Sequence, residues 1–299
     1  EYVRNARNYT IENAGPLINS EWDDFGPVLN ADETMLVFTT RRQDGNLNQN
    51  VFDDLRYYED IFISTKQNGS WLNAENMGQV INTNFHESSL ALSADGRELY
   101  IYRDSNQGDI YYSEYRPDGS WTKPIPLDAP INSSFTENSF SISSDKSIAF
   151  FSSNRPGTLG QLDIYYAVRD SRGKWGVAKN LGATINTPFD EDGPFIDYDG
   201  KTLYFSSKGH KGMGGFDIYK SVYDSATQTW SEPINLGYPM NTPDNDVFFV
   251  ASPDGERGWY ASAREDGFGF TDIYQIWLAD LEEPAQPVAQ NTDPEPENE

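Results

Sequence analysis

The chain has 299 residues, of which 37% are hydrophobic and 14% aromatic, so it can bury a sizeable core, yet its apolar runs are too short to span a membrane. A formal net charge of -25 argues against nucleic acid and anionic lipid surfaces as partners, and the absence of Cys excludes disulfides, thiol catalysis and Cys-based zinc sites. The many Gly, Pro, Tyr and Phe residues favour short strands joined by tight turns.

One sequence unit recurs five times. Each unit opens on an Ile-Asn or Met-Asn pair, and successive Asn residues are 63, 50, 54 and 55 positions apart. The pairs are Ile18-Asn19, Ile81-Asn82, Ile131-Asn132, Ile185-Asn186 and Met240-Asn241. Thirteen residues after each Asn there is an Asp, at Asp32, Asp95, Asp145, Asp199 and Asp254. Five identical offsets indicate a structural repeat.

Each unit predicts four strands. The Asp marks a turn between the first two strands, and it is followed by Gly in three copies, as a turn with positive φ requires, but by Glu33 and Lys146 in the others. An Asp-Ile-aromatic triplet opens the third strand at Asp60, Asp109, Asp163, Asp217 and Asp272. The fourth strand begins with a Trp in four copies, at Trp71, Trp121, Trp175 and Trp230. Four strands in about 50 residues are typical of one β-propeller blade.

The fifth unit ends after its third strand, near Leu278. The segment Asn8 to Gly15 precedes Ile18 in the register that Trp230 to Gly237 occupies before Met240, so we expect it to supply the missing outer strand and close the ring. The fold predicted is therefore an all-β, five-bladed β-propeller of four-stranded antiparallel blades. We expect the propeller to cover residues 1–282, and residues 283–299, acidic and Pro-rich, to be a disordered linker.

The forms Ser-Ala-Asp-Gly-Arg-Glu-Leu-Tyr (Ser93 to Tyr100) and Gly-Gly-Phe-Asp-Ile-Tyr (Gly214 to Tyr219) resemble the TolB-type, WD40-like propeller repeat. Together with Trp-Ser-Glu-Pro-Ile-Asn-Leu-Gly (Trp230 to Gly237) and Ile-Asn-Thr-Pro-Phe-Asp-Glu (Ile185 to Glu191), they are similar to propellers of OmpA-family envelope proteins of Bacteroidetes, which include a type IX secretion component. This resemblance implies a periplasmic, outer-membrane-associated protein whose propeller has no enzymatic activity.

Five residues after each Asn of the repeat stands an acid, at Asp24, Glu87, Glu137, Glu191 and Asp246. The first strand of a blade lines the central channel, so a ring of carboxylates is expected near one channel mouth. Such a ring could hold Ca²⁺. Basic residues after the second strands, at Arg41, Arg103, Arg155, Lys208 and Arg264, favour structural ion pairs between blades over a metal site.

Catalysis by this ring is an alternative because some five-bladed propellers are inverting glycosidases, which need two carboxyl groups of unequal pKa. Equivalent positions in a repeat do not favour unequal environments, so carbohydrate binding or hydrolysis is the alternative function. His86 and His210 belong to no recognisable triad or ligand motif and are expected to be exposed loop residues. Asp104 to Asp109 lacks the terminal Glu of a calcium loop. We therefore expect no catalytic residue, metal or cofactor.

The first unit is longer than the others because of an insertion at Arg42 to Glu59. Loops that depart from a repeat can carry function without disturbing the core, although an insertion can equally pack on its own blade. The candidate partner-binding residues are Phe52, Leu55, Tyr57 and Tyr58. We expect a monomeric domain that binds protein partners in the cell envelope.

Overall fold

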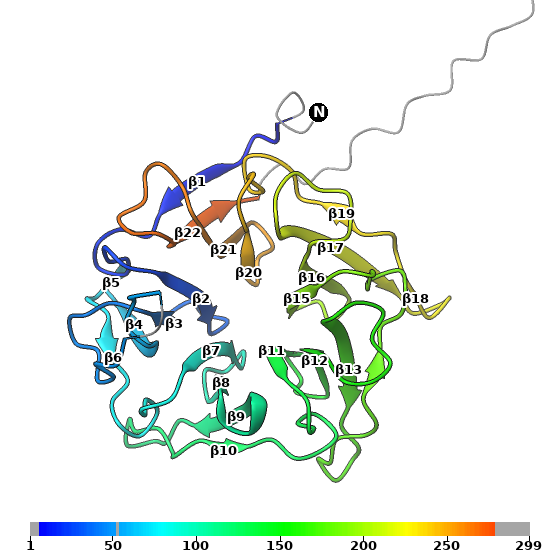
Figure 1. Ribbon diagram of the computed structural model, residues 1–299, viewed down its shortest axis with the longest axis horizontal. Coiled ribbons are helices and arrows are strands. Elements are labelled where there is room, and N and C mark those ends of the chain that lie inside the picture. Colours follow the sequence, from blue (N-terminus) through cyan, green and yellow to red (C-terminus); the bar gives the residue numbers. More distant parts are fainter. Residues whose placement is uncertain (1–5, 52–53, 279–299) are drawn as a thin grey trace, which may run out of the picture.

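The computed structural model describes residues 6–51 and 54–278, which form five antiparallel sheets arranged as a ring (Figure 1). The first strand of each sheet lies nearest the centre and the last lies at the rim. This arrangement confirms the predicted five-bladed β-propeller. A 3-10 turn at Ser105–Gln107 is the one helical element of the described part, and no helix there is long and apolar enough to cross a membrane. The expected boundary at residue 282 and the linker 283–299 lie outside the described residues.

The first three blades each begin with the strand predicted to follow a repeat Asn. Blade 1 contains β2 (Asp24–Leu29), β3 (Met35–Thr40), β4 (Asp60–Gln67) and an outer strand split into β5 (Ser70–Trp71) and β6 (Glu75–Asn76). Blade 2 contains β7 (Glu87–Leu92), β8 (Glu98–Arg103), β9 (Asp109–Glu114) and β10 (Ile125–Pro126). Blade 3 contains β11 (Glu137–Ile142), β12 (Ile148–Ser153), β13 (Asp163–Val168) and β14 (Lys179–Asn180).

The last two blades follow the same order. Blade 4 contains β15 (Glu191–Ile196), β16 (Thr202–Ser207), β17 (Asp217–Asp224) and a split outer strand, β18 (Thr229–Trp230) and β19 (Ile234–Asn235). Blade 5 contains β20 (Val247–Ala251), β21 (Arg257–Ser262), β22 (Asp272–Trp277) and β1 (Thr10–Asn13).

The ring closes through the N-terminal strand, as predicted. β1 pairs antiparallel with β22, with Thr10 opposite Trp277 and Asn13 opposite Tyr274. Tyr9 is buried, and its hydroxyl donates to the carbonyl oxygen of Leu236 at 3.0 Å, which ties this segment to blade 4 as well. Blade 5 is therefore built from both ends of the described chain, and its third strand has no open edge along β1.

The repeated Asn joins one blade to the next. The side-chain amide of Asn186 donates to the carbonyl oxygen of Ile164 at 3.0 Å, and its oxygen accepts the backbone N–H of the same residue at 2.8 Å. The amide thus occupies the place of a neighbouring strand at the start of β13. The same pair of bonds joins the other four Asn residues to the preceding blade: Asn19 to Ile273, Asn82 to Ile61, Asn132 to Ile110 and Asn241 to Ile218.

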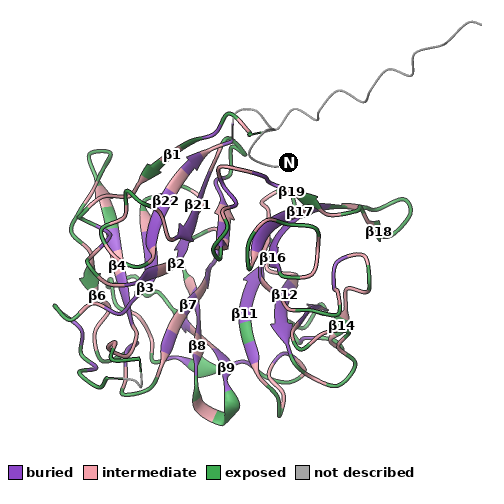
Figure 2. Cartoon of the chain, turned by 45° about the horizontal axis from the view of Figure 1, so that its top comes forward, coloured by how far each residue is buried: buried purple, intermediate pink, exposed green. Residues whose placement is uncertain are grey.

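The hydrophobic core consists of five clusters, each between two adjacent blades. Figure 2 shows the buried residues along the strands and the exposed ones at the loops and the rim. The Trp residues that open the fourth strands contribute to these layers. Trp71 of blade 1 meets Trp259 of blade 5 edge to face, with ring centroids 5.9 Å apart, and Trp230 of blade 4 meets Phe150 of blade 3 at 6.0 Å.

Two turns between first and second strands lack Gly, and both adopt the positive φ that the repeat requires. Glu33 and Lys146 have φ values of 50° and 59°, close to the 68° of Gly96. Each side chain pairs with a neighbouring blade. Glu33 accepts Arg257 at 2.8 Å, and Lys146 contacts Asp95 at 3.1 Å and Glu98 at 3.0 Å. A positive φ costs a residue other than Gly about 1–2 kcal/mol, and the ion pairs offset part of this cost.

Candidate functional site

One face of the ring carries both sets of long loops, and we call it the loop face. It comprises the loops that enter the first strands (residues 14–23, 77–86, 127–136, 181–190 and 236–245) and the loops between second and third strands (residues 41–59, 104–108, 154–162, 208–216 and 263–271). The two sets interlock. A Cβ atom at Gly160 would lie 1.9 Å from the carbonyl oxygen of Phe189, and one at Gly269 would lie 2.0 Å from that of Trp22. Glycine is required there because the backbones of adjacent blades touch.

The five repeat acids do not line a channel mouth, contrary to the prediction. Asp24, Glu87, Glu137, Glu191 and Asp246 are all at most 1% exposed. Each carboxylate folds back onto the loop that precedes it. In Glu137, for example, the carboxylate accepts the backbone N–H of Ser133 at 3.0 Å and the hydroxyl of the same residue at 2.7 Å. The acids therefore hold the entry loops in shape. No cluster of three metal-ligating side chains occurs in residues 6–51 and 54–278.

The ion pairs of these acids lie within one blade, not between blades. Arg103 meets Glu87 at 3.0 Å and Arg155 meets Glu137 at 2.8 Å. In blade 1 the partner of Asp24 is Arg42, at 2.6 Å, and not the expected Arg41. Each of the three guanidinium groups also donates to the carbonyl oxygen of the Ile in the repeat pair, at Ile18, Ile81 and Ile131. These bonds tie the entry loop of each of the three blades to the end of that blade's second strand.

Blades 4 and 5 depart from this arrangement. In blade 4 His210 takes the place of the arginine, and its ring donates to the carbonyl oxygen of Ile185 at 2.8 Å. Lys208 pairs instead with Asp190 at the surface, 3.0 Å away. In blade 5 the guanidinium of Arg264 donates to the carbonyl oxygen of Pro239. Both histidines lie in loops, as predicted, but they are partly buried and not exposed. The His86 ring stacks on Tyr58 with centroids 3.9 Å apart, and its Nδ1 contacts Glu59.

Burial is the main cause of a raised pKa in Asp24, Glu87, Glu191 and Asp246. It raises the pKa of Asp24 and Glu191 above their usual values, although the cations and hydroxyls around them act in the opposite direction. At Asp246 burial, with a contribution from the charge of Asp217, raises the pKa to about 7. Asp246 accepts bonds from Thr242 and Ser262 and has no ion pair among the described residues.

The Asp246→Asn variant is expected to gain stability relative to the wild type as pH rises. A raised carboxyl pKa means that the native state holds a proton that the unfolded chain has released. Asp246 therefore lowers wild-type stability between pH 4 and 7, whereas Asn does not titrate. Denaturant unfolding at pH 5 and pH 7.5 should show the difference between variant and wild type growing by on the order of 1–2 kcal/mol. A difference that is the same at both pH values would contradict this assignment.

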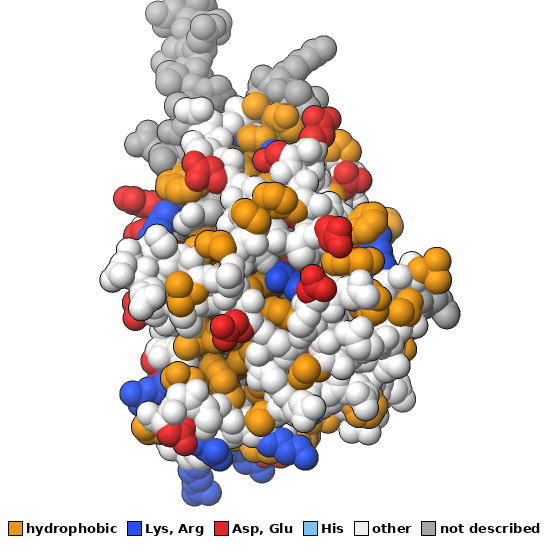
Figure 3. All heavy atoms as spheres, turned by 90° about the vertical axis from the view of Figure 1, so that its left-hand side faces the viewer, with side chains coloured by type: hydrophobic (Ala, Val, Ile, Leu, Met, Phe, Trp, Pro, Cys, Tyr) orange, Lys and Arg blue, Asp and Glu red, His pale blue; other side chains and the backbone are white. Residues whose placement is uncertain are grey.

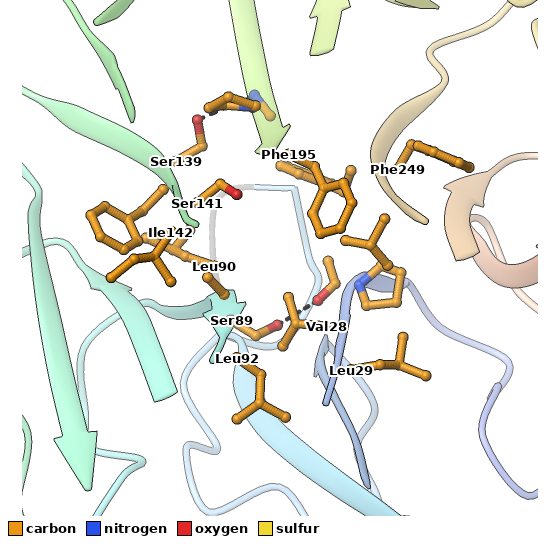
Figure 4. A pocket seen from close by; sticks show the side chains of 18 residues that line it. Val28, Leu29, Ser89, Leu90, Leu92, Ser139, Ser141, Ile142, Phe195 and Phe249 are labelled. Carbon is orange, nitrogen blue, oxygen red and sulfur yellow. Dashed lines mark hydrogen bonds between the residues drawn. The ribbon is translucent and has the colours of Figure 1, made fainter. Parts of the chain in front are cut away.

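The central cavity is narrow and mainly apolar. It has a volume of about 40 Å³ and is lined by residues of all five first strands (Figure 4). Labelled side chains around it include Val28, Leu90, Ser139 and Phe195, and none of the five repeat acids lines it. This volume holds a few water molecules but no sugar ring. Carbohydrate therefore has no room inside this cavity, and none of the carboxylates expected at the channel mouth reaches it.

The insertion in blade 1 lies over its two neighbouring blades. Arg56 binds Asp23, and its guanidinium stacks over the ring of Phe270 in blade 5 at 4.1 Å. Asn48 donates to the carbonyl oxygen of Phe85, at the entry to blade 2. Tyr57 packs edge to face on Trp22 at 5.6 Å. The insertion thus packs on its own molecule and contacts both neighbouring blades, and its role in partner binding stays a prediction.

The four candidate partner-binding residues differ in availability. Leu55 is 81% exposed, while Tyr57 and Tyr58 are half-buried against other side chains, and Phe52 lies outside the described residues. Sequence reasoning missed a second set. In the described part of the chain every exposed Phe lies on the loop face: Phe85, Phe135, Phe189, Phe268 and Phe270. Three of them stand three residues after a repeat Asn, where Trp22 stands in the first unit, and that offset was visible in the sequence.

The fold is shared with TolB proteins and with glycoside-cleaving enzymes. No family model and no curated protein matches the sequence. Among solved structures, TolB from Acinetobacter baumannii has a TM-score of 0.50 at 13% identity, covering 87% of this chain and 56% of that one. A putative TolB from Agrobacterium tumefaciens has a TM-score of 0.50 at 18% identity, covering 87% and 79%. The α-L-arabinofuranosidase of Podospora anserina, solved with cellotriose, has a TM-score of 0.55 at 12% identity, covering 88% and 94%.

These likenesses establish a TolB-like β-propeller fold. This chain spans just over half the length of the Acinetobacter TolB chain. The prediction that it is not an enzyme is corrected by the same comparison, because the arabinofuranosidase and a further glycoside hydrolase, with a TM-score of 0.54 at 10% identity and covering 94% of this chain and 92% of that one, share its fold. The propeller fold by itself is therefore compatible with catalysis.

Proposed function

We propose that this propeller is a protein-interaction module that binds a partner protein through its loop face. The observation that carries the proposal is the gathering of exposed phenylalanines there. The loops of Phe189, Phe268 and Phe270 are held in place by close glycine contacts with adjacent blades. Aromatic side chains on a rigid surface supply much of the binding energy at protein interfaces, because they bury a large area at a low entropy cost.

We propose further that the partner belongs to the cell envelope and that the chain acts in the periplasm, associated with the outer membrane. The resemblance of the repeat to OmpA-family propellers supports this location, and the TolB-like fold agrees with it. The type IX secretion component PorE is one of these OmpA-family propeller proteins, so we propose that the partner is a component of the secretion machinery. The acidic net charge agrees with a protein partner because it disfavours nucleic acid and anionic lipid.

The triple variant Phe85→Ala/Phe189→Ala/Phe268→Ala should weaken partner binding at least about tenfold, a loss of roughly 1.4 kcal/mol. The three side chains are 52%, 59% and 51% exposed, so their removal should leave the fold intact. The partner is first captured from envelope fractions with the immobilised protein and identified. Its affinity for each purified propeller variant is then measured by calorimetry.

A matched control is Ile125→Ala/Val168→Ala/Val222→Ala, whose side chains are 50%, 45% and 43% exposed on outer or third strands away from the loop face. Its affinity should stay within about twofold of the wild type, since contacts outside an interface contribute little. If the control lost affinity and the phenylalanine variant did not, the partner-binding surface would lie on the rim and not on the loop face. Substitution of Tyr57 and Tyr58 would be a poorer test because both side chains pack on the molecule itself.

A further inference from the structure

Beside the insertion, the loop face is hollowed by a groove that we call the blade 1 groove. It has a volume of about 870 Å³ and lies within blade 1. Three segments form it: the entry loop from Pro16 to Trp22, the start of the insertion from Arg42 to Gly45, and the outer-strand segment from Asn73 to Asn76. It is more than twenty times larger than the central cavity. An extended segment of another molecule can therefore enter it.

Carboxylates without a cationic partner surround this groove. Glu21, Asp44 and Glu75 are exposed, and no ion pair within residues 6–51 and 54–278 includes any of them. Arg42 is the one basic residue of the lining. Its guanidinium is already bound to Asp24 and to the carbonyl oxygen of Ile18. It also lies over the ring of Phe62, 4.8 Å from the centroid. The groove therefore keeps a net negative charge.

The wall of the groove is partly apolar. Leu17 is 43% exposed, and Trp22 is half-buried, with its ring held edge to face by Tyr57. Phe62 and Ala74 complete this surface. An apolar wall beside carboxylates suits a long side chain such as that of Lys or Arg. The aliphatic stem covers the apolar surface, and the charged end lies among the carboxylates. An aromatic ring beside the path adds a cation–π contact.

We propose that the blade 1 groove binds an extended, Lys- and Arg-bearing segment of the partner protein. The inference rests on the proposed function and specifies the chemistry of the partner. A second copy of this chain would bring another net charge of -25. The chain's own segment 282–299 contains only acidic charges, so it would be repelled as well. Figure 3 shows acidic side chains over the upper flank, around blades 5 and 1, with Lys and Arg gathered at the lower end, toward blade 2.

The test uses a fluorescein-labelled peptide, Gly-Lys-Arg-Gly-Lys-Arg-Gly, and fluorescence anisotropy with the full chain at 150 mM NaCl. Glu21→Gln/Asp44→Asn/Glu75→Gln should weaken peptide binding about tenfold, since the carboxylates that pair with its cations are removed. A matched control, Asp118→Asn/Asp170→Asn/Asp224→Asn, changes the net charge equally at exposed turns outside the loop face. The control should lose less than about twofold because distant exposed charges are screened at this ionic strength.

Equal losses in the two variants would overturn the inference, since the peptide would then be attracted by overall charge alone. Cellotetraose serves as a neutral probe. The inference would also be overturned if cellotetraose bound, if Trp22→Ala abolished that binding, and if the triple carboxylate variant bound the peptide as tightly as the wild type. The groove would then be assigned to carbohydrate. The proposed function is tested separately, because it requires the phenylalanine variant to bind the captured partner more weakly. The groove inference can fail even if that variant does lose affinity.

Discussion

Deletion of residues 1–15 is expected to lower the melting temperature of the propeller sharply. The deletion removes β1, so β22 loses its outer ladder from Thr10 to Asn13 and exposes an edge. It also removes Tyr9, which is buried in the cluster between blades 4 and 5, and loss of a buried aromatic side chain alone costs about 3–5 kcal/mol. For a domain of this size such a loss lowers the melting temperature by on the order of 10 °C.

Scanning calorimetry checks this expectation, with Thr10→Ser/Glu12→Gln as a control that changes two exposed side chains and keeps the strand. A synthetic peptide of residues 6–15, added in excess to the truncated protein, should restore much of the lost stability because it can occupy the same edge. A truncated protein that melts like the intact one, with no response to the peptide, would mean that β1 does not close the ring in solution.

Arg155→Met is expected to be the most destabilising single substitution on the loop face. Glu137 is fully buried and Arg155 is the one cation that contacts it among the described residues, so Met leaves a carboxylate without its counter-charge. Breaking a buried pair in this way costs about 3–5 kcal/mol, well above the 1 kcal/mol expected for a partly exposed pair. The carbonyl oxygens of Pro130 and Ile131 lose a donor as well.

The surface pair Lys208–Asp190 provides the matched control, because its lysine side chain is 41% exposed. Lys208→Met should lower the free energy of unfolding by less than about 1 kcal/mol. The double variant Arg155→Met/Glu137→Leu should recover part of the loss, since no uncompensated charge remains buried. Guanidinium unfolding at pH 7 distinguishes the cases. Similar losses for Arg155→Met and Lys208→Met would show that burial does not strengthen the first pair.

The repeat allowed the architecture to be predicted because each of its markers has a backbone task. The Asn bridges the preceding blade, the turn Asp is followed by a residue of positive φ, and the third-strand Asp accepts loop amides, as Asp163 does from Leu159 and Gly160. The spacing of residues along the chain is therefore enough to identify those with such backbone roles. The match of Asn8 to Gly15 with a fourth strand depended on the same logic and located the closure.

Side-chain direction was harder to predict than position. The acids at the start of the first strands were expected to face the channel, but the Ser or Thr four residues earlier binds each carboxylate and turns it into the entry loop, as Thr187 does for Glu191. Arg41 and Arg42 are adjacent, and sequence did not decide which one contacts Asp24. Three of the exposed phenylalanines, Phe85, Phe135 and Phe189, stand at a regular offset from the repeat Asn, so the repeat could have located them.

The pairing of Thr10 with Trp277 has a mechanical consequence. The chain enters and leaves blade 5 at the same end of the same sheet, so the two attachment points are about 5 Å apart. Anything tethered before and after the propeller is held side by side at one point of its rim. A force that separates the two tethers would break the β1–β22 ladder one residue pair at a time, beginning at Thr10, instead of shearing all pairs together. The seam of the ring is therefore its mechanical weak point, and tension along the chain would open blade 5 first.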